Sequence, residues 1–234
     1  MFTDRHGGAS GHSRSLDLSV QESDQGAQAI DQGALAMVMD SLDGDLRLAQ
    51  MRQVHGCEVA VVSAPGWSTA DALVTTHPGL ALLVRSADCV PVLLSSAQGV
   101  IGAVHAGREG MALGVVPSIV DNMRLLGAQQ ISAWIGPHIC GSCYEVPLDL
   151  QQRVGRLVPE AICTTRKGTS GLDLGAGVIS QLHESGVEVE YVGGCTLEGA
   201  DFHSFRRDGE MAGRQAGIIW LPKGDENDDQ GWPG

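Results

Sequence analysis

The chain has 234 residues, of which 43% are hydrophobic and 18% charged, so it is long enough for one large domain with a substantial buried core. Its 28 acidic residues outnumber 15 basic ones, and the net charge of −13 argues against general binding to nucleic acid or to an acidic membrane surface. No apolar run approaches the roughly 20 residues of a membrane span, and the polar start MFTDRHGGAS does not read as a secretory signal, so we expect a cytoplasmic protein. Six cysteines in such a chain predict free thiols rather than a disulfide framework.

The first half of the chain predicts one helix followed by a series of strands. Loosely helical apolar spacing from Gly26 to Met39 predicts a helix that ends near Leu42. Short β-prone runs separated by Gly, Pro or Asp then predict strands at Cys57–Ser63, Ala72–Thr75, Leu80–Arg85, Val90–Leu94 and Val100–His105.

The second half predicts more helices. Met111–Leu126 is expected to be helical, with its start shifted or kinked by Pro117. Further helices are predicted at 147–157 and 172–184, and strands at 131–136, 187–192 and 218–221. Because strands and helices intermix without strict alternation, we predict an α/β fold in which mixed sheets are covered by helices. We expect one layered domain over residues 1–221 and an acidic, disordered tail over 222–234.

Three potential soft-metal ligands stand where predicted strands meet Gly- or Pro-containing turns: His55 in QVHG, Cys89 in SADC and His105 in VHAG. Two imidazoles and a thiolate leave one position open on a tetrahedral zinc ion, which is the composition of a catalytic site. Their separations match no zinc-finger pattern, and a His or Cys at a strand end is often only packed or hydrogen-bonded. The spacing alone leaves both interpretations open.

Two other segments carry reactive or charged side chains. Cys140 and Cys143 are spaced like half of a zinc ribbon, but Cys57, Cys163 and Cys195 are isolated in the sequence, which favours chance proximity in a Gly-rich loop. Cys143 alone, near a histidine, can still be a nucleophile. The segment FRRDG at 205–209, with Arg214 a few residues on, is either a solvated turn or a clamp for phosphate or ribose.

Seven segments in order resemble the YfiH-like proteins, long described as multicopper polyphenol oxidase (laccase-domain) proteins. They are FTDRHGGAS (2–10), QVHG (53–56), DALVTTHPGLALLV (71–84), ADCVPVLL (87–94), GAVHAGREG (102–110), WIGPHICGSCYEV (134–146) and FHSFRRDGEMAGRQAGIIWL (202–221). The resemblance implies a metal held by His55, Cys89 and His105, most simply zinc, with copper as the alternative. It implies a layered α/β fold similar to that of some toxin deamidases. It also implies a substrate pocket near the CYEV and FRRDG segments.

The resemblance further implies a zinc-dependent purine nucleoside phosphorylase for adenosine, inosine and methylthioadenosine, with adenosine deaminase activity. Its partners would be a purine nucleoside and phosphate. On this hypothesis the residues that contribute to catalysis are Cys143, His203 and Arg206, and those that bind substrate are Arg5, Arg108, Arg207 and Arg214.

One position departs from the family, which usually has HAGWRG: here Arg108 replaces the Trp and Glu109 replaces the Arg. A carboxylate beside the metal site would repel phosphate, so weaker phosphorolysis is expected unless Arg108 neutralises it. Two alternatives remain: a hydrolase that removes a wrong amino acid from a nucleotide-linked muramyl precursor, and a catalytically inactive metal-binding protein. A multicopper oxidase ranks last, because eight scattered histidines do not form its paired ligand repeats.

Overall fold

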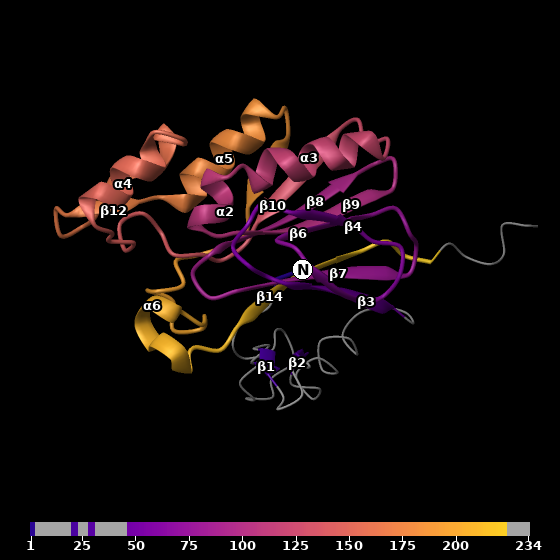
Figure 1. Ribbon diagram of the computed structural model, residues 1–234, viewed down its shortest axis with the longest axis horizontal. Coiled ribbons are helices and arrows are strands. Elements are labelled where there is room, and N and C mark those ends of the chain that lie inside the picture. The colour runs from indigo at the N-terminus through magenta and orange to yellow at the C-terminus, as the bar shows by residue number, and fades with distance from the viewer. Residues whose placement is uncertain (3–19, 23–27, 31–45, 224–234) are drawn as a thin grey trace, which may run out of the picture.

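The computed structural model describes residues 1–2, 20–22, 28–30 and 46–223, in which two sheets are stacked and helices cover the outer face of the larger one (Figure 1). The larger sheet has six strands in the order β13 (Glu188–Tyr191), β10 (Ile131–Ile135), β8 (Val90–Ser96), β9 (Val100–Ala106), β6 (Ala72–Thr75) and β4 (Val59–Val61). The smaller sheet has four strands in the order β14 (Gln215–Trp220), β7 (Leu80–Ser86), β3 (Arg47–Arg52) and β5 (Gly66–Thr69).

Both sheets are mixed. In the larger sheet β13 is parallel to β10 and β4 is parallel to β6, whereas the pairs β10–β8, β8–β9 and β9–β6 are antiparallel. In the smaller sheet β14 is antiparallel to β7, while β3 runs parallel to both β7 and β5. This arrangement confirms the predicted α/β fold with mixed sheets.

The helices of the described residues are α2 (Arg108–Ala112), α3 (Val115–Leu125), α4 (Leu148–Gly155), α5 (Leu174–Glu184) and the short α6 (Phe205–Asp208). Two short antiparallel pairs, β1 (Val20–Glu22) with β2 (Gln28–Ile30) and β11 (Ile162–Thr164) with β12 (Ser170–Leu172), lie outside the two sheets. Single 3-10 turns occur at Pro159–Ala161 and Gly209–Met211. Within the described part of the chain, no helix has the length and apolar character needed to cross a membrane.

The inner strands β8, β9 and β6 of the larger sheet are buried on both faces, which explains their apolar sequences. In β6, Ala72 and Val74 belong to the core under the helices, whereas Leu73 belongs to the core between the two sheets. The same alternation occurs in β9, where Val104 faces the helices and Ile101 the second sheet. Because successive side chains of a strand point to opposite faces, a strand between two layers must be apolar throughout.

The predicted helix at Met111–Leu126 is instead two helices, α2 and α3, separated at Gly114. That residue has φ +86°, a left-handed conformation that glycine adopts without steric cost. Pro117 lies in the first turn of α3, where its missing N–H removes no intrahelical hydrogen bond, so it marks the shifted start of the helix.

The predicted helix from Gly26 to Leu42 is wrong where the structure describes it. Gln28–Ile30 forms strand β2 and pairs with Val20–Glu22, so local hairpin pairing prevails over the loose helical spacing. The rest of that segment, and residues 224–234 of the predicted acidic tail, lie outside the described residues.

Candidate metal centre and active site

The structure brings His55, Cys89 and His105 together from three separate segments. His55 follows β3, Cys89 lies in the turn between β7 and β8, and His105 is near the end of β9. One ligand atom from each of them lies within 4.8 Å of the other two. The two imidazole rings meet edge to face with centroids 4.7 Å apart. Three donors this close, two nitrogens and one sulfur, can surround one tetrahedral metal ion.

A single buried carboxylate positions both histidines. Asp71, at 0% exposure, accepts hydrogen bonds from the backbone N–H groups of Val54, His55 and Gly56 at 2.7–3.1 Å. The same carboxylate lies 2.8 Å from Nδ1 of His105. A hydrogen bond at Nδ1 leaves Nε2 of His105 as the metal-facing atom, which is the usual carboxylate–histidine–metal arrangement.

The backbone around the centre is unusual at two residues. Among the described residues, only His55 (φ +59°) and Asp88 (φ +94°) are non-glycine residues with positive φ. Asp88 is held by two short hydrogen bonds, since its carboxylate accepts from Thr196 Oγ1 and from the backbone N–H of Arg206, each at 2.6 Å. Such conformations cost about 1–3 kcal/mol and persist where surrounding contacts impose them. Here they orient His55 and the neighbouring Cys89.

Glycine allows the backbone of the HAGREG segment to pass close to the centre. A Cβ on Gly107 would lie 2.9 Å from Cδ2 of His55 and 3.3 Å from Sγ of Cys89. A Cβ on Gly110 would lie 2.6 Å from the carbonyl oxygen of Gly56. Both glycines are therefore required by close approach, because a Cβ at 107 would displace His55 and Cys89 and a Cβ at 110 would displace the backbone next to His55.

Cys89 and His105 shift each other's pKa. Burial alone would raise the pKa of Cys89, but the positive charge and hydrogen bond of His105, with a smaller contribution from His55, lower it to about 6. Burial would lower the pKa of His105, but the charge of Cys89 and the hydrogen bond with Asp71 raise it to about 9. Cys89 is thus favoured as a thiolate, which is the form of cysteine that binds metal.

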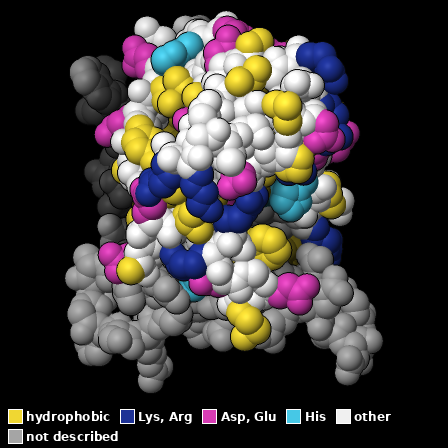
Figure 2. Space-filling model, turned by 90° about the vertical axis from the view of Figure 1, so that its left-hand side faces the viewer, with side chains coloured by type: hydrophobic (Ala, Val, Ile, Leu, Met, Phe, Trp, Pro, Cys, Tyr) yellow, Lys and Arg dark blue, Asp and Glu magenta, His cyan; other side chains and the backbone are white. Residues whose placement is uncertain are grey.

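The centre forms one part of a cavity of about 610 Å³. The apolar part of its lining includes Ile139, Leu174 and Phe205, together with the ring of Tyr144. Four arginines also line it: Arg85, Arg108, Arg206 and Arg214. On the face of the molecule that carries α4 and α6, Arg and Lys side chains form a band with a His side chain beside it (Figure 2).

Arg85 is the most deeply buried of these arginines, at 6% exposure. Its Nη2 donates to the carbonyl of Met51 at 2.7 Å, but Nη1 has no hydrogen-bond partner among the described residues, and neither has Oγ of the neighbouring Ser86. Burial, and then the charge of Arg214, lower the pKa of Arg85 to about 10. Two guanidinium groups and an unpartnered donor in one cavity form an environment that an anion would stabilise.

Three of the other arginines proposed from the sequence line the cavity, and a fourth does not. Arg108, Arg206 and Arg214 line the cavity, as stated above. Arg207 donates to the backbone carbonyls of Thr196, Leu197, Gly199 and Phe202 and pairs with Asp208, so its guanidinium is engaged in holding the chain.

His203 and Cys143 lie elsewhere. His203 is 4% exposed, and its backbone N–H donates to Gln215. Cys143 lies with Cys140 and Cys195, a grouping that the isolated position of Cys195 in the sequence did not indicate. Arg5 lies outside the described residues.

The departure at Glu109 is compensated in the structure. One carboxylate oxygen of Glu109 accepts from Nε of Arg108 at 3.1 Å and from Nη2 of Arg153 at 3.3 Å. The side chain is 44% exposed. The expected repulsion of phosphate assumed an unpaired carboxylate at the pocket, and this pairing offsets its charge.

Two important residues were missed by the reasoning from sequence. Asp71 stands just before a fully buried strand, ALVT, and Arg85 is the last residue but one of another, LALLVRS. A charged side chain at the boundary of a buried strand needs a partner or a ligand, and that signal could have identified both residues.

Known proteins resemble this chain along most of its length. The family described as multi-copper polyphenol oxidoreductase laccase matches residues 1–222. The chain is 45% identical over 235 residues to a purine nucleoside phosphorylase of Streptomyces coelicolor, with 94% of each chain covered. It is 38% identical over 227 residues to a purine nucleoside phosphorylase of Deinococcus radiodurans, covering 95% of this chain and 88% of the relative.

Solved structures show the same fold. The YfiH protein of Bacillus licheniformis superposes with a TM-score of 0.78 at 29% identity, covering 94% of this chain and 91% of that one. YlmD of Geobacillus stearothermophilus gives a TM-score of 0.75 at 25% identity, with 95% and 91% covered. The chain therefore belongs to the multi-copper polyphenol oxidoreductase laccase family, the YfiH-like proteins.

Proposed function

We propose that the protein is a zinc-dependent purine nucleoside phosphorylase acting on adenosine, inosine and methylthioadenosine. The observation that carries this proposal is that one cavity combines the His55, Cys89 and His105 centre with the buried Arg85 and the half-buried Arg214. Its volume of about 610 Å³ lies within the range of about 300–1,000 Å³ that is usual for small-molecule sites. The relatives named purine nucleoside phosphorylase support the same assignment.

In this proposal phosphate occupies the arginine side of the cavity. Nη1 of Arg85 and Oγ of Ser86, unpartnered among the described residues, would donate to phosphate oxygens, and Arg214 would add a second charge. One phosphate oxygen then attacks the anomeric carbon of the ribose. The glycosidic bond breaks, its electron pair leaves with the purine, and the products are ribose 1-phosphate and the free base.

The apolar side of the cavity would hold the base. The guanidinium of Arg206 stacks on the ring of Tyr144 at 4.8 Å, and Arg108 donates to the hydroxyl of Tyr144 at 3.2 Å. These contacts fix the tyrosine ring from two sides. With Phe205 and Leu174 nearby in the lining, they would leave a flat apolar slot that suits a purine.

The donor set of the centre fits zinc. Two imidazoles and a thiolate are typical zinc ligands, and Asp71 orients His105 for such a role. Zinc bound there would supply a Lewis acid that polarises a substrate oxygen. The same donor set also suits copper, so the metal must be identified by analysis of the purified protein.

Hydrolytic deamination of adenosine is a second candidate activity. Three protein ligands leave one coordination position open, and that is the composition of hydrolytic zinc sites. The reaction would replace the amino group with an oxygen from water and release ammonia, without phosphate.

The test is an assay of zinc-loaded protein with adenosine, inosine or methylthioadenosine over a range of phosphate concentrations. Phosphate-dependent release of the free base is expected, together with ribose 1-phosphate from adenosine or inosine and methylthioribose 1-phosphate from methylthioadenosine. Arg214→Gln should raise KM for phosphate at least tenfold, because a hydrogen bond to a charged group is worth about 1.5–3 kcal/mol. Arg156→Gln, at an exposed residue just after α4, is the matched control.

Other products would contradict this proposal. Inosine and ammonia formed without phosphate would indicate the deaminase alone. Release of an amino acid from a nucleotide-linked muramyl precursor would indicate the editing hydrolase. Inertness towards all of these substrates would indicate a metal-binding protein without catalysis.

A further inference from the structure

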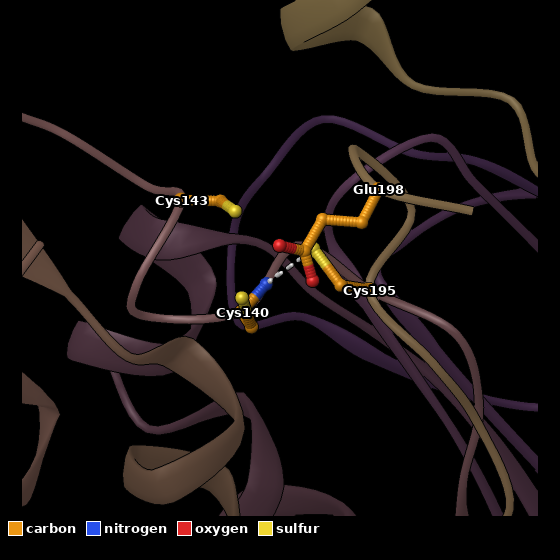
Figure 3. Close-up of side chains that lie close together, drawn as sticks. All are labelled: Cys140, Cys143, Cys195 and Glu198. Atoms are coloured by element: carbon orange, nitrogen blue, oxygen red, sulfur yellow. Dashed lines mark hydrogen bonds between the residues drawn. The ribbon is translucent and has the colours of Figure 1, made fainter. Parts of the chain in front are cut away.

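A second cluster of metal-ligating side chains lies apart from the candidate active site. Cys140, Cys143, Cys195 and Glu198 each offer one atom within 4.8 Å of the others (Figure 3). We call the three cysteines together with Glu198 the three-cysteine cluster. All three cysteines are free thiols of intermediate exposure, so an ion can reach them from solvent.

The sheet topology explains why these distant segments meet. Strands β10 and β13 are parallel neighbours, with Ile135 opposite Tyr191 at their carboxyl ends. The chain leaves both strands at the same edge, and a further parallel bridge joins His138 to Cys195. This places the Cys140–Cys143 turn beside the loop that carries Cys195.

The local backbone is arranged as in a metal-binding turn. Cys143 N–H donates to the carbonyl of Cys140 at 2.9 Å, which closes a tight turn and directs both thiols to one side. The backbone N–H of Cys140 donates to Sγ of Cys195 at 3.4 Å. An N–H group aimed at sulfur favours a thiolate, the form that binds metal.

The donor chemistry favours zinc. Three sulfurs and one carboxylate make a complete set of four protein ligands, and such closed sets are characteristic of structural zinc sites. Zinc–sulfur bonds of about 2.3 Å place tetrahedral sulfurs about 3.8 Å apart, compatible with the spacing here. Glu198 also pairs with Arg166. Zinc with three thiolates and a carboxylate would form a complex of net negative charge, and the positive charge of Arg166 would offset part of it.

We propose that the three-cysteine cluster is a second, structural zinc site that ties the loop carrying Cys195 and Glu198 to the loop of Cys140 and Cys143, which forms part of the cavity wall. Ile139, which precedes Cys140, and Tyr144, which follows Cys143, both line that cavity. Thr196, which follows Cys195, donates to Asp88, the residue before Cys89. Zinc at the cluster therefore fixes the loops that position the pocket wall and the Cys89 turn.

The first test removes the other centre. A full-length Cys89→Ala/His105→Ala variant, incubated with zinc alone and then desalted, should retain about one zinc per chain. Adding Cys195→Ser should abolish this retention, whereas adding Cys57→Ser, outside both clusters, should leave it unchanged. With cobalt, the Cys89→Ala/His105→Ala variant should show sulfur-to-metal charge-transfer absorption, since Cys89 is absent and the cluster supplies the thiolates.

A second measurement uses the unaltered chain, so it does not depend on a variant that folds. Zinc should protect Cys140, Cys143 and Cys195 from alkylation, read by peptide mass, while Cys57 stays as reactive as it is without zinc. No zinc retention by the Cys89→Ala/His105→Ala variant together with unprotected cluster thiols would overturn the proposal. So would a disulfide within the cluster that persists when zinc is supplied under reducing conditions.

Discussion

Asp71 lies 2.8 Å from Nδ1 of His105 and also accepts the backbone N–H of His55 at 3.0 Å, so one buried carboxylate positions two candidate metal ligands from different segments of the chain. Burial alone would raise the pKa of Asp71, but the hydrogen bonds from His105 and from the backbone of Gly56 outweigh it and hold the pKa below its ordinary value. Asp71 is therefore ionised at neutral pH and acts as an anchor for the whole centre.

Asp71→Asn should weaken zinc binding at the first centre by about 10–100-fold, which is the usual effect of losing the carboxylate behind a ligating histidine. An amide has one accepting oxygen, so at least one N–H now satisfied by Asp71 would lose its partner, at a cost of about 1–3 kcal/mol in stability. Competition with a chelator measures the affinity and urea unfolding measures the stability. Asp121→Asn, on the exposed face of α3, is the control. Unchanged zinc affinity would show that Asp71 does not orient the centre.

Gly107→Ala should reduce zinc affinity, because the new Cβ would lie 2.9 Å from His55 and 3.3 Å from Cys89. The matched control is Gly127→Ala, at a turn with φ +99° and no atom near the new Cβ. That control should destabilise the fold by about 1–2 kcal/mol through backbone strain, with zinc affinity unchanged. Comparison of the two separates an effect on the centre from a general loss of stability. Equal zinc affinity in both variants would contradict the argument.

The inner strands of the larger sheet could be predicted from the sequence, because each is a continuous run of mostly apolar residues. Runs such as VIGAVHA at β9 are apolar along their whole length, as strands buried on both faces must be. Strand β3, RLAQMR, has no such signal, because only Ala49 and Met51 reach the core and the rest is polar or partly exposed. The three metal-ligand candidates were found from their strand ends and from the family resemblance.

Contacts between residues far apart in the sequence could not be predicted, because the sheet topology creates them. Cys195 seemed isolated because its neighbours Cys140 and Cys143 lie on the other side of a helix-containing crossover, and only the parallel pairing of β10 with β13 unites them. The charge of Arg207 predicts a substrate-binding residue. In the structure its guanidinium donates to backbone carbonyls of Thr196 and Phe202, and no pattern of side chains in the sequence indicates such contacts.

Arg207→Ala should act on stability more than on substrate binding. The guanidinium donates to the carbonyls of Thr196 at 3.1 Å and Phe202 at 2.6 Å, and so links the loop after β13 to α6. Loss of these contacts should lower the free energy of unfolding by about 2 kcal/mol. In urea unfolding, Arg207→Lys should be nearly as unstable, since a single ammonium group cannot reach the same fan of carbonyls. A large rise in KM for phosphate with normal stability would instead place Arg207 at the substrate.

Glu109→Gln should leave KM for phosphate nearly unchanged. The carboxylate accepts from Arg108 and from Arg153, and at 44% exposure its remaining field is weakened by water and salt. Exposed pairs of this kind contribute about 0.2–1 kcal/mol, so the stability loss should also be small. The informative comparison is the double variant Arg108→Trp/Glu109→Arg, which restores the usual family residues and removes the Arg108–Glu109 pair. If the pairing already offsets Glu109, both variants should keep KM for phosphate within about threefold of the unaltered protein in steady-state assays with inosine. A tenfold or larger fall in KM for either variant would show that the carboxylate repels phosphate despite its two arginine partners.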